Sequence, residues 1–327
     1  MTLPQTLTYK AYGYKNNRSP IQEFERSINL VPSNGDYIAP KDKVLIKIAY
    51  AALNPVDIKI YSLIYSILNL YSSNFGFGAD FSGEVVSVGE NVVDYKVGDL
   101  VQGVYHSLKA GTVSEYILLD PKKTYIAKKA DKIDLAHSAA WPLVLGTAIT
   151  MIKDLDLKDK KVLILGGATS VGRNLIQIAK IEQAREIIAS CSGKSEELVK
   201  KLGADSIIDY KKHSNMLNPV LESAKSGKFD IILDCWGGDE LFSSMKYILD
   251  GTYNTVVGDS IGNSKISLLK SVKSPIRQIA STFGLLPYKY NLLFLNHSSS
   301  GPGSVVELAR DYLSTGKIEI FIDHIYN

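Results

Sequence analysis

The sequence of 327 residues contains only two cysteines, Cys191 and Cys235. Two thiols cannot build a disulfide framework or a four-thiolate zinc site, so we expect both to be buried in a reducing compartment. The chain also lacks an uninterrupted apolar run of the about 18 residues that a membrane-spanning helix needs. Its N-terminus lacks the apolar core of a secretory signal. These absences predict a cytoplasmic protein that is not secreted.

The sequence also has little net charge, a formal +3 at pH 7. A balance this close to neutral does not indicate nucleic acid as a partner. The content of 45% hydrophobic and 22% charged residues is typical of a globular protein, and the length favours two domains.

Residues 1–120 read as short strands separated by turns. The stretches "KVLIKIAYAALN", "GEVVSVGENV", "VGDLVQGVY" and "GTVSEYILLD" are β-rich and end at Gly, Asp, Asn or Pro. This pattern predicts an antiparallel, barrel-like domain.

From about residue 133 the pattern changes to alternating strands and helices. Four successive strand–helix units predict a parallel sheet with helices on both faces. The expected strands are 162–165, 186–190, 206–209, 230–234 and 253–257, and the expected helices are 171–181, 195–202, 214–226 and 239–249.

The first of these units, "KVLILGGATSVGRNLIQIAK", has the layout of a dinucleotide-binding turn. Gly166 and Gly172 occupy the outer glycine positions of the fingerprint, with Gly167 and Val171 inside the turn, but Thr169 replaces the middle glycine. A positive φ at that position costs about 1–2 kcal/mol for a residue with a Cβ.

Against that cost, the hydroxyls of Thr169 and Ser170 can donate to phosphate oxygens at the helix N-terminus. We therefore predict weakened but retained binding of a dinucleotide. The alternative is a strand–helix turn that holds no ligand.

The second strand of this series ends in "SCSGK" rather than in the acidic residue that an NAD-selective site uses. The hydroxyl of Ser192 and the ammonium of Lys194 suit the additional 2′-phosphate of NADP. The alternative is that Lys194 is an ordinary solvated residue before a helix.

Taken in order, these segments resemble the medium-chain dehydrogenase/reductase superfamily, and within it the zinc-free, quinone-oxidoreductase-like branch. The resemblance is carried by "AALNPVDIKIYS", "GADFSGEVVSVGENV", "VGDLVQG", "AAWPLVLGTA", the glycine turn, "KKLGADSIIDYKK", "FDIILDCWGG" and "LDGTYNTVVGD". It implies an α/β protein with a GroES-like, β-rich catalytic domain over residues 1–124, to which residues 315–327 return. A Rossmann domain with a doubly wound parallel sheet would bind NADP over residues 125–314.

The resemblance also implies the chemistry. Where zinc-dependent members carry a catalytic cysteine and Gly-His-Glu, this chain has Asn54 and Gly78-Ala79-Asp80, so no zinc is expected. The implied reaction is hydride transfer from NADPH to a quinone or an α,β-unsaturated carbonyl.

The resemblance implies a possible homo-oligomer, because homo-oligomers are common among relatives. It also implies the residues of the site. Asn54 and Thr147 would line the nicotinamide, Tyr61 would face the acceptor, Tyr210 would lie beside the 2′-phosphate, and Gly258 would close over the nicotinamide end.

Three departures support a second hypothesis, a catalytically weak or inactive relative. Active relatives usually have two glycines at Thr169-Ser170, and they continue beyond the "GKIEIFIDHIYN" segment with a helix and a closing strand. The third departure is the stretch 260–306, which has no acidic residue and interleaves basic with apolar residues. With the "TSV" turn, this stretch resembles a fungal side branch associated with lipid droplets and mitochondria.

In this hypothesis the basic stretch lies on a membrane or lipid-droplet surface or binds a protein. The alternative is that it packs over the substrate cleft or at a dimer interface.

Overall fold

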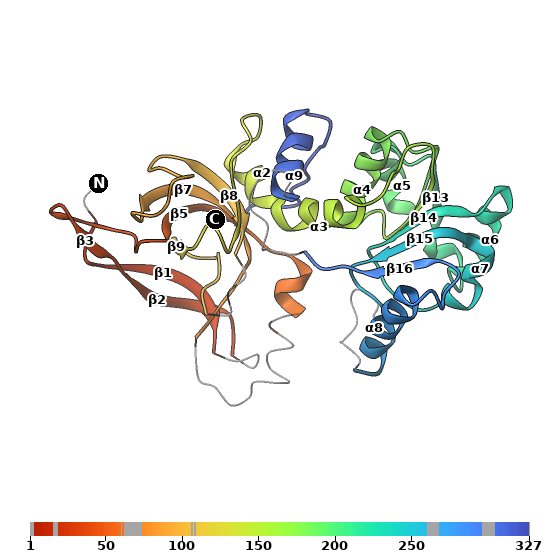
Figure 1. Ribbon diagram of the computed structural model, residues 1–327, viewed down its shortest axis with the longest axis horizontal. Coiled ribbons are helices and arrows are strands. Elements are labelled where there is room, and N and C mark those ends of the chain that lie inside the picture. Colours follow the sequence, from red (N-terminus) through yellow and green to blue (C-terminus); the bar gives the residue numbers. More distant parts are fainter. Residues whose placement is uncertain are drawn as a thin grey trace. The chain divides into compact units, whose positions relative to one another are not determined.

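The computed structural model describes residues 3–15, 19–59, 61, 74–105, 107, 109–259, 268–295 and 305–326, without the side chains of 268–271 and 306. The chain falls into two compact units, Met1–Gly146 with Asn296–Asn327, and Thr147–Leu295 (Figure 1). The expected domain boundary lies at 124–125, whereas the segment up to Gly146 belongs to the first unit. The last helix, α9 (Val305–Ser314), also belongs to the first unit.

The first unit consists mainly of antiparallel strands, which confirms the prediction of a GroES-like, β-rich domain. A five-stranded sheet has the order β10-β8-β7-β5-β9, and a three-stranded sheet has the order β2-β1-β6. Apolar side chains of the five-stranded sheet, such as Ile46, Phe81 and Ile117, form its core. The bounds are β1 (Thr6–Tyr14), β2 (Gln22–Asn29), β3 (Val31–Ser33), β4 (Asp36–Ile38), β5 (Val44–Ala52), β6 (Phe75–Gly76), β7 (Asp80–Val88), β8 (Leu100–Val104), β9 (Tyr116–Leu119), β10 (Tyr125–Lys128), α2 (Leu135–Ala140) and α3 (Pro142–Ile152).

The second unit is a six-stranded parallel sheet of order β13-β12-β11-β14-β15-β16. In chain order this is 3-2-1-4-5-6, the doubly wound arrangement in which ligands bind where the strand order reverses, between β11 and β14. The Rossmann prediction is therefore confirmed. The strands are β11 (Lys161–Leu165), β12 (Glu186–Cys191), β13 (Ser206–Asp209), β14 (Phe229–Asp234), β15 (Leu249–Thr255) and β16 (Lys289–Leu292), and the α-helices are α4 (Ser170–Ile181), α5 (Glu196–Lys201), α6 (Leu217–Ser223), α7 (Met245–Ile248) and α8 (Leu268–Thr282).

One expected helix of this unit, 239–249, is largely absent. The structure has a 3₁₀ turn, η4 (Phe242–Ser244), followed by the four residues of α7. Ser243 and Ser244 are weak helix formers. The missing part is therefore the start of the expected helix. Strand β15 also begins at Leu249, which pairs with Phe229, and not at the expected residue 253.

No helix within the described ranges is both long enough and apolar enough to cross a membrane.

Strand β11, which leads into the glycine turn, is buried along its whole length, including Lys161 at its start. The Lys161 Nζ donates to the carbonyl oxygen of Ser223 at 2.7 Å and to Ser226 Oγ at 2.8 Å. It also forms a 3.2 Å ion pair with Glu186, the first residue of β12. A buried ammonium is tolerated here because these oxygens replace its water. Lys161 thereby fixes the start of β11 against β12 and the loop before β14.

Replacing Lys161 with Met should lower the free energy of unfolding by about 1–3 kcal/mol, because Ser223, Ser226 and Glu186 lose a charged donor that lies in the interior. Urea unfolding followed by circular dichroism measures this change. Lys158→Met, at an exposed position just before the same strand, is the control and should be nearly neutral. Equal effects of the two substitutions would contradict the anchoring role.

Candidate functional site

The turn between β11 and α4 depends on three glycines. Gly166 has φ +79°, a backbone conformation that favours glycine. A Cβ on Gly172 would lie 2.2 Å from the carbonyl oxygen of Gly166, and one on Gly167 would lie 2.7 Å from the Ala189 Cβ. These contacts hold the N-terminus of α4 directly against the end of β11.

Thr169 does not have the strained backbone that we expected at this position. Its φ is −69° and its ψ 158°, so the expected cost of a positive φ is wrong. Thr169 is the N-cap of α4: its Oγ1 accepts from the N–H of Gly172 at 3.0 Å and donates to the carbonyl oxygen of Gly166 at 2.7 Å. The hydroxyl proton is therefore used within the turn and is not directed at a phosphate.

Ser170 and Val171 follow as the first two residues of α4, and the side chain of Ser170 is exposed. The N–H groups of the first helical residues have no partner within the helix, so they remain suited to an anion.

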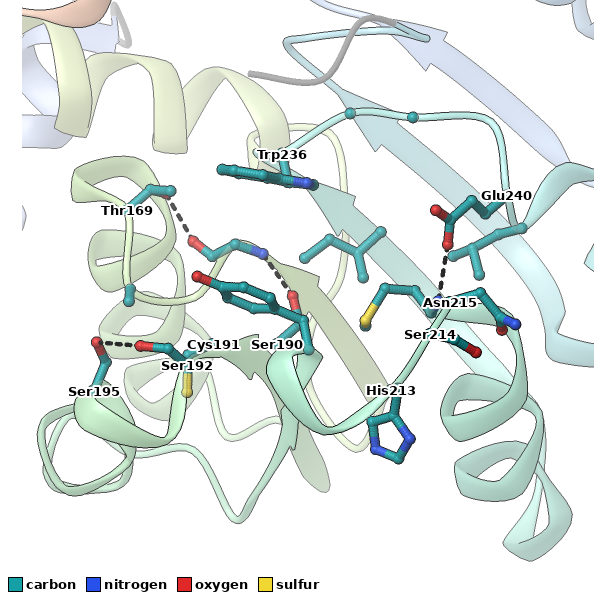
Figure 2. A pocket seen from close by; sticks show the side chains of 18 of the residues that line it. Thr169, Ser190, Cys191, Ser192, Ser195, His213, Ser214, Asn215, Trp236 and Glu240 are labelled. Atoms are coloured by element: carbon teal, nitrogen blue, oxygen red, sulfur yellow. Dashed lines mark hydrogen bonds between the residues drawn. The ribbon is translucent and has the colours of Figure 1, made fainter. Parts of the chain in front are cut away.

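A cavity of about 400 Å³ lies at the carboxyl ends of β11, β12 and β14, where the strand order reverses (Figure 2). This size is within the range of small-molecule sites. Of the ten residues predicted to bind the cofactor, Gly166, Thr169, Ser192 and Tyr210 line the cavity. The other six are not among the residues that line it: Gly167, Ser170, Val171, Gly172, Lys194 and Gly258.

The cavity wall at the end of β12 is built from hydroxyls rather than carboxylates. Ser190 Oγ accepts from the N–H of Gly166 at 2.9 Å, which ties this strand to the glycine turn. Ser192 and Ser195 face each other with their Oγ atoms 3.4 Å apart, and Lys194 between them is exposed. Figure 2 shows Ser192 and Ser195 on one side of the cavity and Glu240 on the other.

One carboxylate does come near this wall. A Cβ on Gly193 would lie 2.8 Å from Asp209 Oδ2. Asp209 accepts from the N–H of Lys211 at 3.1 Å and forms a 3.9 Å ion pair with Lys212. It therefore caps the 3₁₀ turn η2 (Tyr210–Lys212), which begins with Tyr210.

The sequence analysis missed Trp236, which lies at the end of β14 and lines the cavity. The rings of Trp236 and Tyr210 are nearly parallel, with centroids 6.3 Å apart and an interplanar angle of 18°. Ser195 and His213 also line the cavity and were missed. The available signal for Trp236 was "DCWGG", an aromatic residue followed by two glycines at the end of a buried strand.

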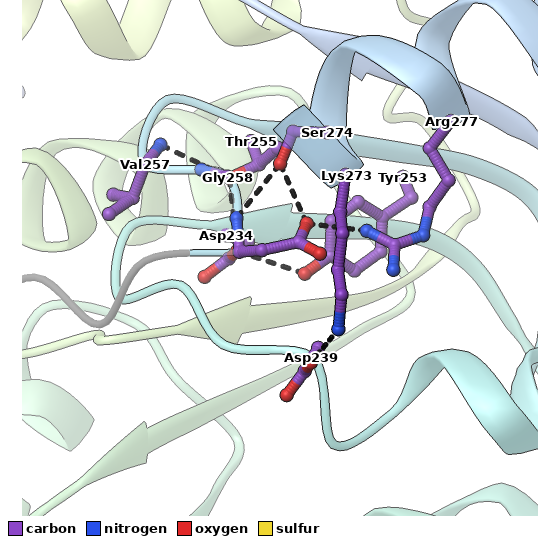
Figure 3. A network of polar contacts seen from close by, with 10 residues as sticks. Asp234, Asp239, Tyr253, Thr255, Val257, Gly258, Lys273, Ser274 and Arg277 are labelled. Carbon is purple, nitrogen blue, oxygen red and sulfur yellow. Dashed lines mark hydrogen bonds and ion pairs between the residues drawn. The ribbon is translucent and has the colours of Figure 1, made fainter. Parts of the chain in front are cut away.

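The turn that carries Trp236 is anchored by Asp234, which is fully buried. Its Oδ1 accepts from the N–H groups of Trp236 and Gly237 at 2.9 and 2.8 Å. Its Oδ2 accepts from the hydroxyls of Tyr253 and Thr255 at 2.9 and 3.0 Å (Figure 3). Burial raises the pKa of this carboxyl, while the four donors act in the opposite direction.

Gly258 lies at the end of the loop that follows β15 and has φ +68°. Its N–H donates to Thr255 Oγ1 at 3.0 Å, and a Cβ at this position would lie 2.6 Å from Ser274 Oγ. The next residue, Asp259, accepts from Ser274 Oγ at 2.6 Å and pairs with Arg277, so the loop is fixed to α8 (Figure 3).

In the first unit, two buried carboxylates hold Asn54. Asp57 Oδ2 accepts from the N–H of Asn54 at 2.7 Å, and Asp80 Oδ2 accepts from its Nδ2 at 2.8 Å. Asp80 Oδ1 also accepts from the N–H of Leu143 at 3.0 Å. Asp80 therefore joins Asn54 to the first turn of α3, the helix that also carries Thr147.

The hydroxyl of Tyr61 donates to the carbonyl oxygen of Ser19 at 3.0 Å, and its ring packs edge-on against Tyr14 at 4.7 Å. The proton of the phenol is thus used within the first unit in this structure.

The residues at the positions of the family's zinc ligands do not suit a zinc ion. Asn54 and Ala79 offer neither a thiolate nor an imidazole, and Asp80 is the one carboxylate of the three. Across the described part of the chain, no three His, Cys, Asp or Glu residues form a group that could hold a metal ion.

Burial raises the pKa of Asp57 to about 6 and that of Asp80 well above its ordinary value. The folded-state pKa of Asp57 exceeds the unfolded value of about 3.9, so the folded state binds more protons between these two values. Stability supplied by this protonation is present below about pH 4 and is lost as the pH rises through about 6.

The variant Asp57→Asn keeps an oxygen acceptor for the N–H of Asn54 but does not titrate. Between about pH 4 and pH 7, the free energy of unfolding of the wild type should fall relative to that of the variant by about 2–3 kcal/mol. Urea unfolding at a series of pH values measures the difference. Asp131→Asn, at an exposed position, is the control, and a difference that stays constant with pH would contradict the assignment.

Comparisons with known proteins agree with this architecture. Residues 40–130 match the model of the alcohol dehydrogenase GroES-like domain, and residues 170–293 match that of the zinc-binding dehydrogenase family. The protein YIM1 of Vanderwaltozyma polyspora is 31% identical over 98% of this chain and 93% of its own length. The protein AST1 of Saccharomyces cerevisiae is 29% identical over 88% of this chain and 76% of its own length.

Solved structures show the same fold. The quinone oxidoreductase from Coxiella burnetii has a TM-score of 0.74 at 22% identity and covers 97% of this chain and 91% of its own. The Escherichia coli quinone oxidoreductase complexed with NADPH has a TM-score of 0.69 at 18% identity and covers 97% of this chain and 90% of its own. The chain therefore belongs to the medium-chain dehydrogenase/reductase superfamily, as a member with a quinone-oxidoreductase-like fold.

Proposed function

We propose that this protein is an NADPH-dependent, zinc-independent oxidoreductase that reduces a quinone or an α,β-unsaturated carbonyl. The observation that carries the proposal is the cavity at the reversal of strand order, whose β12 wall offers hydroxyls in place of a carboxylate. Bound NADPH supplies the hydride, and the protein binds and orients the cofactor.

The diphosphate would lie at the N-terminus of α4, where the N–H groups of Ser170 and Val171 have no helical partner. Thr169 contributes by shaping this turn rather than by donating to the phosphate. The close packing of Gly167 and Gly172 keeps these N–H groups at the end of β11.

The 2′-phosphate would be held by Ser192, Ser195 and Tyr210, all of which line the cavity. Lys194 is exposed between the two serines, and its flexible side chain supplies a positive charge to an anion at this wall. In an NAD-selective site the acidic residue at the end of this strand would repel the same phosphate.

The roles of Asn54 and Thr147 at the nicotinamide, of Tyr61 at the acceptor and of Gly258 at the nicotinamide end are part of the same proposal. The carboxamide nitrogen of Asn54 donates to Asp80, which leaves its oxygen and the second amide hydrogen for other partners. The proposed role of Gly258 is supported by its fixed backbone: its N–H donates to Thr255 Oγ1, and the N–H of the next residue, Asp259, donates to Ser274 Oγ.

Titration with NADPH and NADH, followed by nicotinamide fluorescence, tests this proposal. Replacing Ser192 with Asp should raise the Kd for NADPH at least about tenfold, equal to about 1.4 kcal/mol, because the new carboxylate repels the 2′-phosphate. NADH lacks this phosphate, so its Kd should change less. Ser206→Asp is the control, because Ser206 is the first residue of β13 and thus lies at the amino ends of the strands, away from the cavity.

The proposal is contradicted if the wild type does not bind NADPH at millimolar concentration. It is also contradicted if Ser192→Asp changes the Kd for NADPH and the Kd for NADH equally.

A second candidate function, attachment to a lipid surface, is supported by one observation. Helix α8 exposes Val272, Ile276 and Ile279 on one face, each more than half accessible, and Phe283 and Leu285 beyond its end are 75% exposed. Exposed apolar side chains at this spacing are typical of a face that contacts a partner or a membrane.

The electrostatic part of the lipid hypothesis is weaker than the sequence suggested. Lys273 forms a 3.1 Å ion pair with Asp239, and Arg277 pairs with the buried Asp259, so both cations have partners within the chain (Figure 3). Lys265 and the side chain of Lys270 lie outside the described residues. Lys273 and Arg277 therefore do not support attachment to a surface, whereas the exposed apolar side chains of α8 do.

Flotation with phospholipid vesicles separates the apolar contribution from the cationic one. The double variant Ile276→Asn and Ile279→Asn should lower the partition coefficient at least about tenfold, since it removes exposed apolar surface. Lys273→Gln is the matched control and should leave partitioning unchanged. Loss of partitioning in the control but not in the double variant would contradict the apolar mechanism, and no flotation of the wild type would reject this function.

A further inference from the structure

We infer that Arg277 of α8 is a positioning residue for the nicotinamide half of the cofactor, on which it acts through Asp259 and the loop that carries Gly258. This inference rests on the proposed function and goes beyond it, because it gives α8 a role in cofactor binding. Gly258 and Asp259 follow β15, and Arg277 lies 18 residues after Asp259 in the chain. Figure 3 shows the three residues together in one polar network.

The loop after β15 is held at both of its ends. The N–H groups of Val257 and Gly258 donate to Thr255 Oγ1 at 3.2 and 3.0 Å, and the N–H of Asp259 donates to Ser274 Oγ at 2.9 Å. Thr255 is the last residue of β15, so the first anchor belongs to the sheet, whereas Ser274 belongs to α8. The end of the loop next to Gly258 therefore depends on where α8 lies.

Asp259 carries the second anchor and is fully buried. Its Oδ1 accepts from Ser274 Oγ at 2.6 Å and forms an ion pair with Arg277 Nη1. Within the described part of the chain, the other oxygen, Oδ2, has no hydrogen-bond partner. A buried carboxylate needs a compensating charge, and Arg277 supplies it.

Arg277 is itself fixed by stacking as well as by charge. The carbon of its guanidinium lies 3.5 Å from the centre of the Phe242 ring and 5.8 Å from that of Tyr290, and its side chain is only 18% exposed. A planar guanidinium that stacks and pairs at the same time has a defined orientation. Arg277 therefore joins the loop to the aromatic side chains of η4 and β16.

Gly258 passes this constraint on to the ligand. It has φ +68°, and a Cβ at this position would lie 2.6 Å from Ser274 Oγ, so α8 packs directly against it. In the proposed function Gly258 closes over the nicotinamide end, and a loop that is already ordered lowers the cost of binding. Ordering one or two residues only on binding would raise the Kd about tenfold or more.

The effect should be confined to one half of the cofactor. The contacts that hold the glycine turn and the serine wall, described above for Thr169, Ser190 and Ser192, involve β11, β12 and α4 and not α8. Loss of Arg277 should therefore leave the phosphate-binding elements in place. A residue that only stabilised the second unit would instead weaken the binding of both halves alike.

Calorimetry with NADPH and with adenosine 2′,5′-bisphosphate separates the two halves. Replacing Arg277 alone would leave a buried carboxylate unpaired and destabilise the fold. The test variant is therefore Arg277→Met combined with Asp259→Asn, which removes both charges and keeps an oxygen acceptor for Ser274. We expect its urea midpoint to stay close to that of the wild type, its Kd for NADPH to rise at least about tenfold and its Kd for the bisphosphate to change less than about twofold.

The matched control removes the other ion pair of α8, the exposed 3.1 Å pair of Lys273 and Asp239. Lys273→Met combined with Asp239→Asn should leave the Kd of both ligands unchanged. The fluorescence of NADPH at saturation is a second readout, because it depends on the mobility and surroundings of the nicotinamide ring. This emission should fall in the test variant and not in the control.

The outcomes separate this inference from the proposed function. If the test variant binds NADPH as tightly as the wild type does, the positioning role is wrong and the reductase proposal stands. If the Kd values for NADPH and the bisphosphate rise by the same factor, Arg277 stabilises the whole unit and the positioning role is again wrong. If the wild type binds neither ligand, both proposals fail.

Discussion

The second unit depends on the contact between Gly172 and the carbonyl oxygen of Gly166, where no side chain fits. This contact sets the first turn of α4 on the end of β11 and leaves the helix N-terminus open toward the reversal of strand order. Ser190 ties β12 to the same turn, and a Cβ on Gly166 would lie 3.4 Å from the Cβ of Trp236, in the turn after β14. The elements that enclose the cavity are thus positioned by one close approach of backbone to backbone.

Thr169 shows how such a turn can lose its middle glycine without strain. The backbone at this position is extended, and the side chain takes over the N-cap of α4. The hydroxyl that caps the helix is then not available to a ligand. A polar residue in a glycine turn can therefore stabilise the fold at the expense of the anion site. Retention of the fold at this turn does not imply that anion binding is retained.

The order of strands and helices was predictable because it depends on local patterns. Apolar runs such as "VLIL" and "DIILD", each followed by turn residues, correspond to β11 and β14, and the doubly wound order follows from the family. The end of β12 was also recognisable, because the absence of an acidic residue there is visible in the sequence.

The features that could not be predicted arise from residues far apart in the chain. Tyr210 and Trp236 are brought to one cavity by the strand order, and no spacing in the sequence relates them. The pairing of Arg277 with Asp259 is also a tertiary contact, so a stretch that looked uniformly basic contains cations that are already neutralised. The strain expected at Thr169 was wrong because the sequence does not show which backbone conformation the turn requires.

The burial of both cysteines has a consequence for the chemistry proposed here. Cys191 lines the cavity, Cys235 directly follows β14, and burial raises the pKa of both thiols. Quinones and enones are electrophiles that alkylate thiolates, whereas protonated thiols react slowly. A reductase that encounters such compounds at every turnover would be inactivated by its own substrate if it presented an ionised sulfur. Both sulfur atoms of this chain are instead buried, so the proposed reaction would leave them largely out of reach of its substrate.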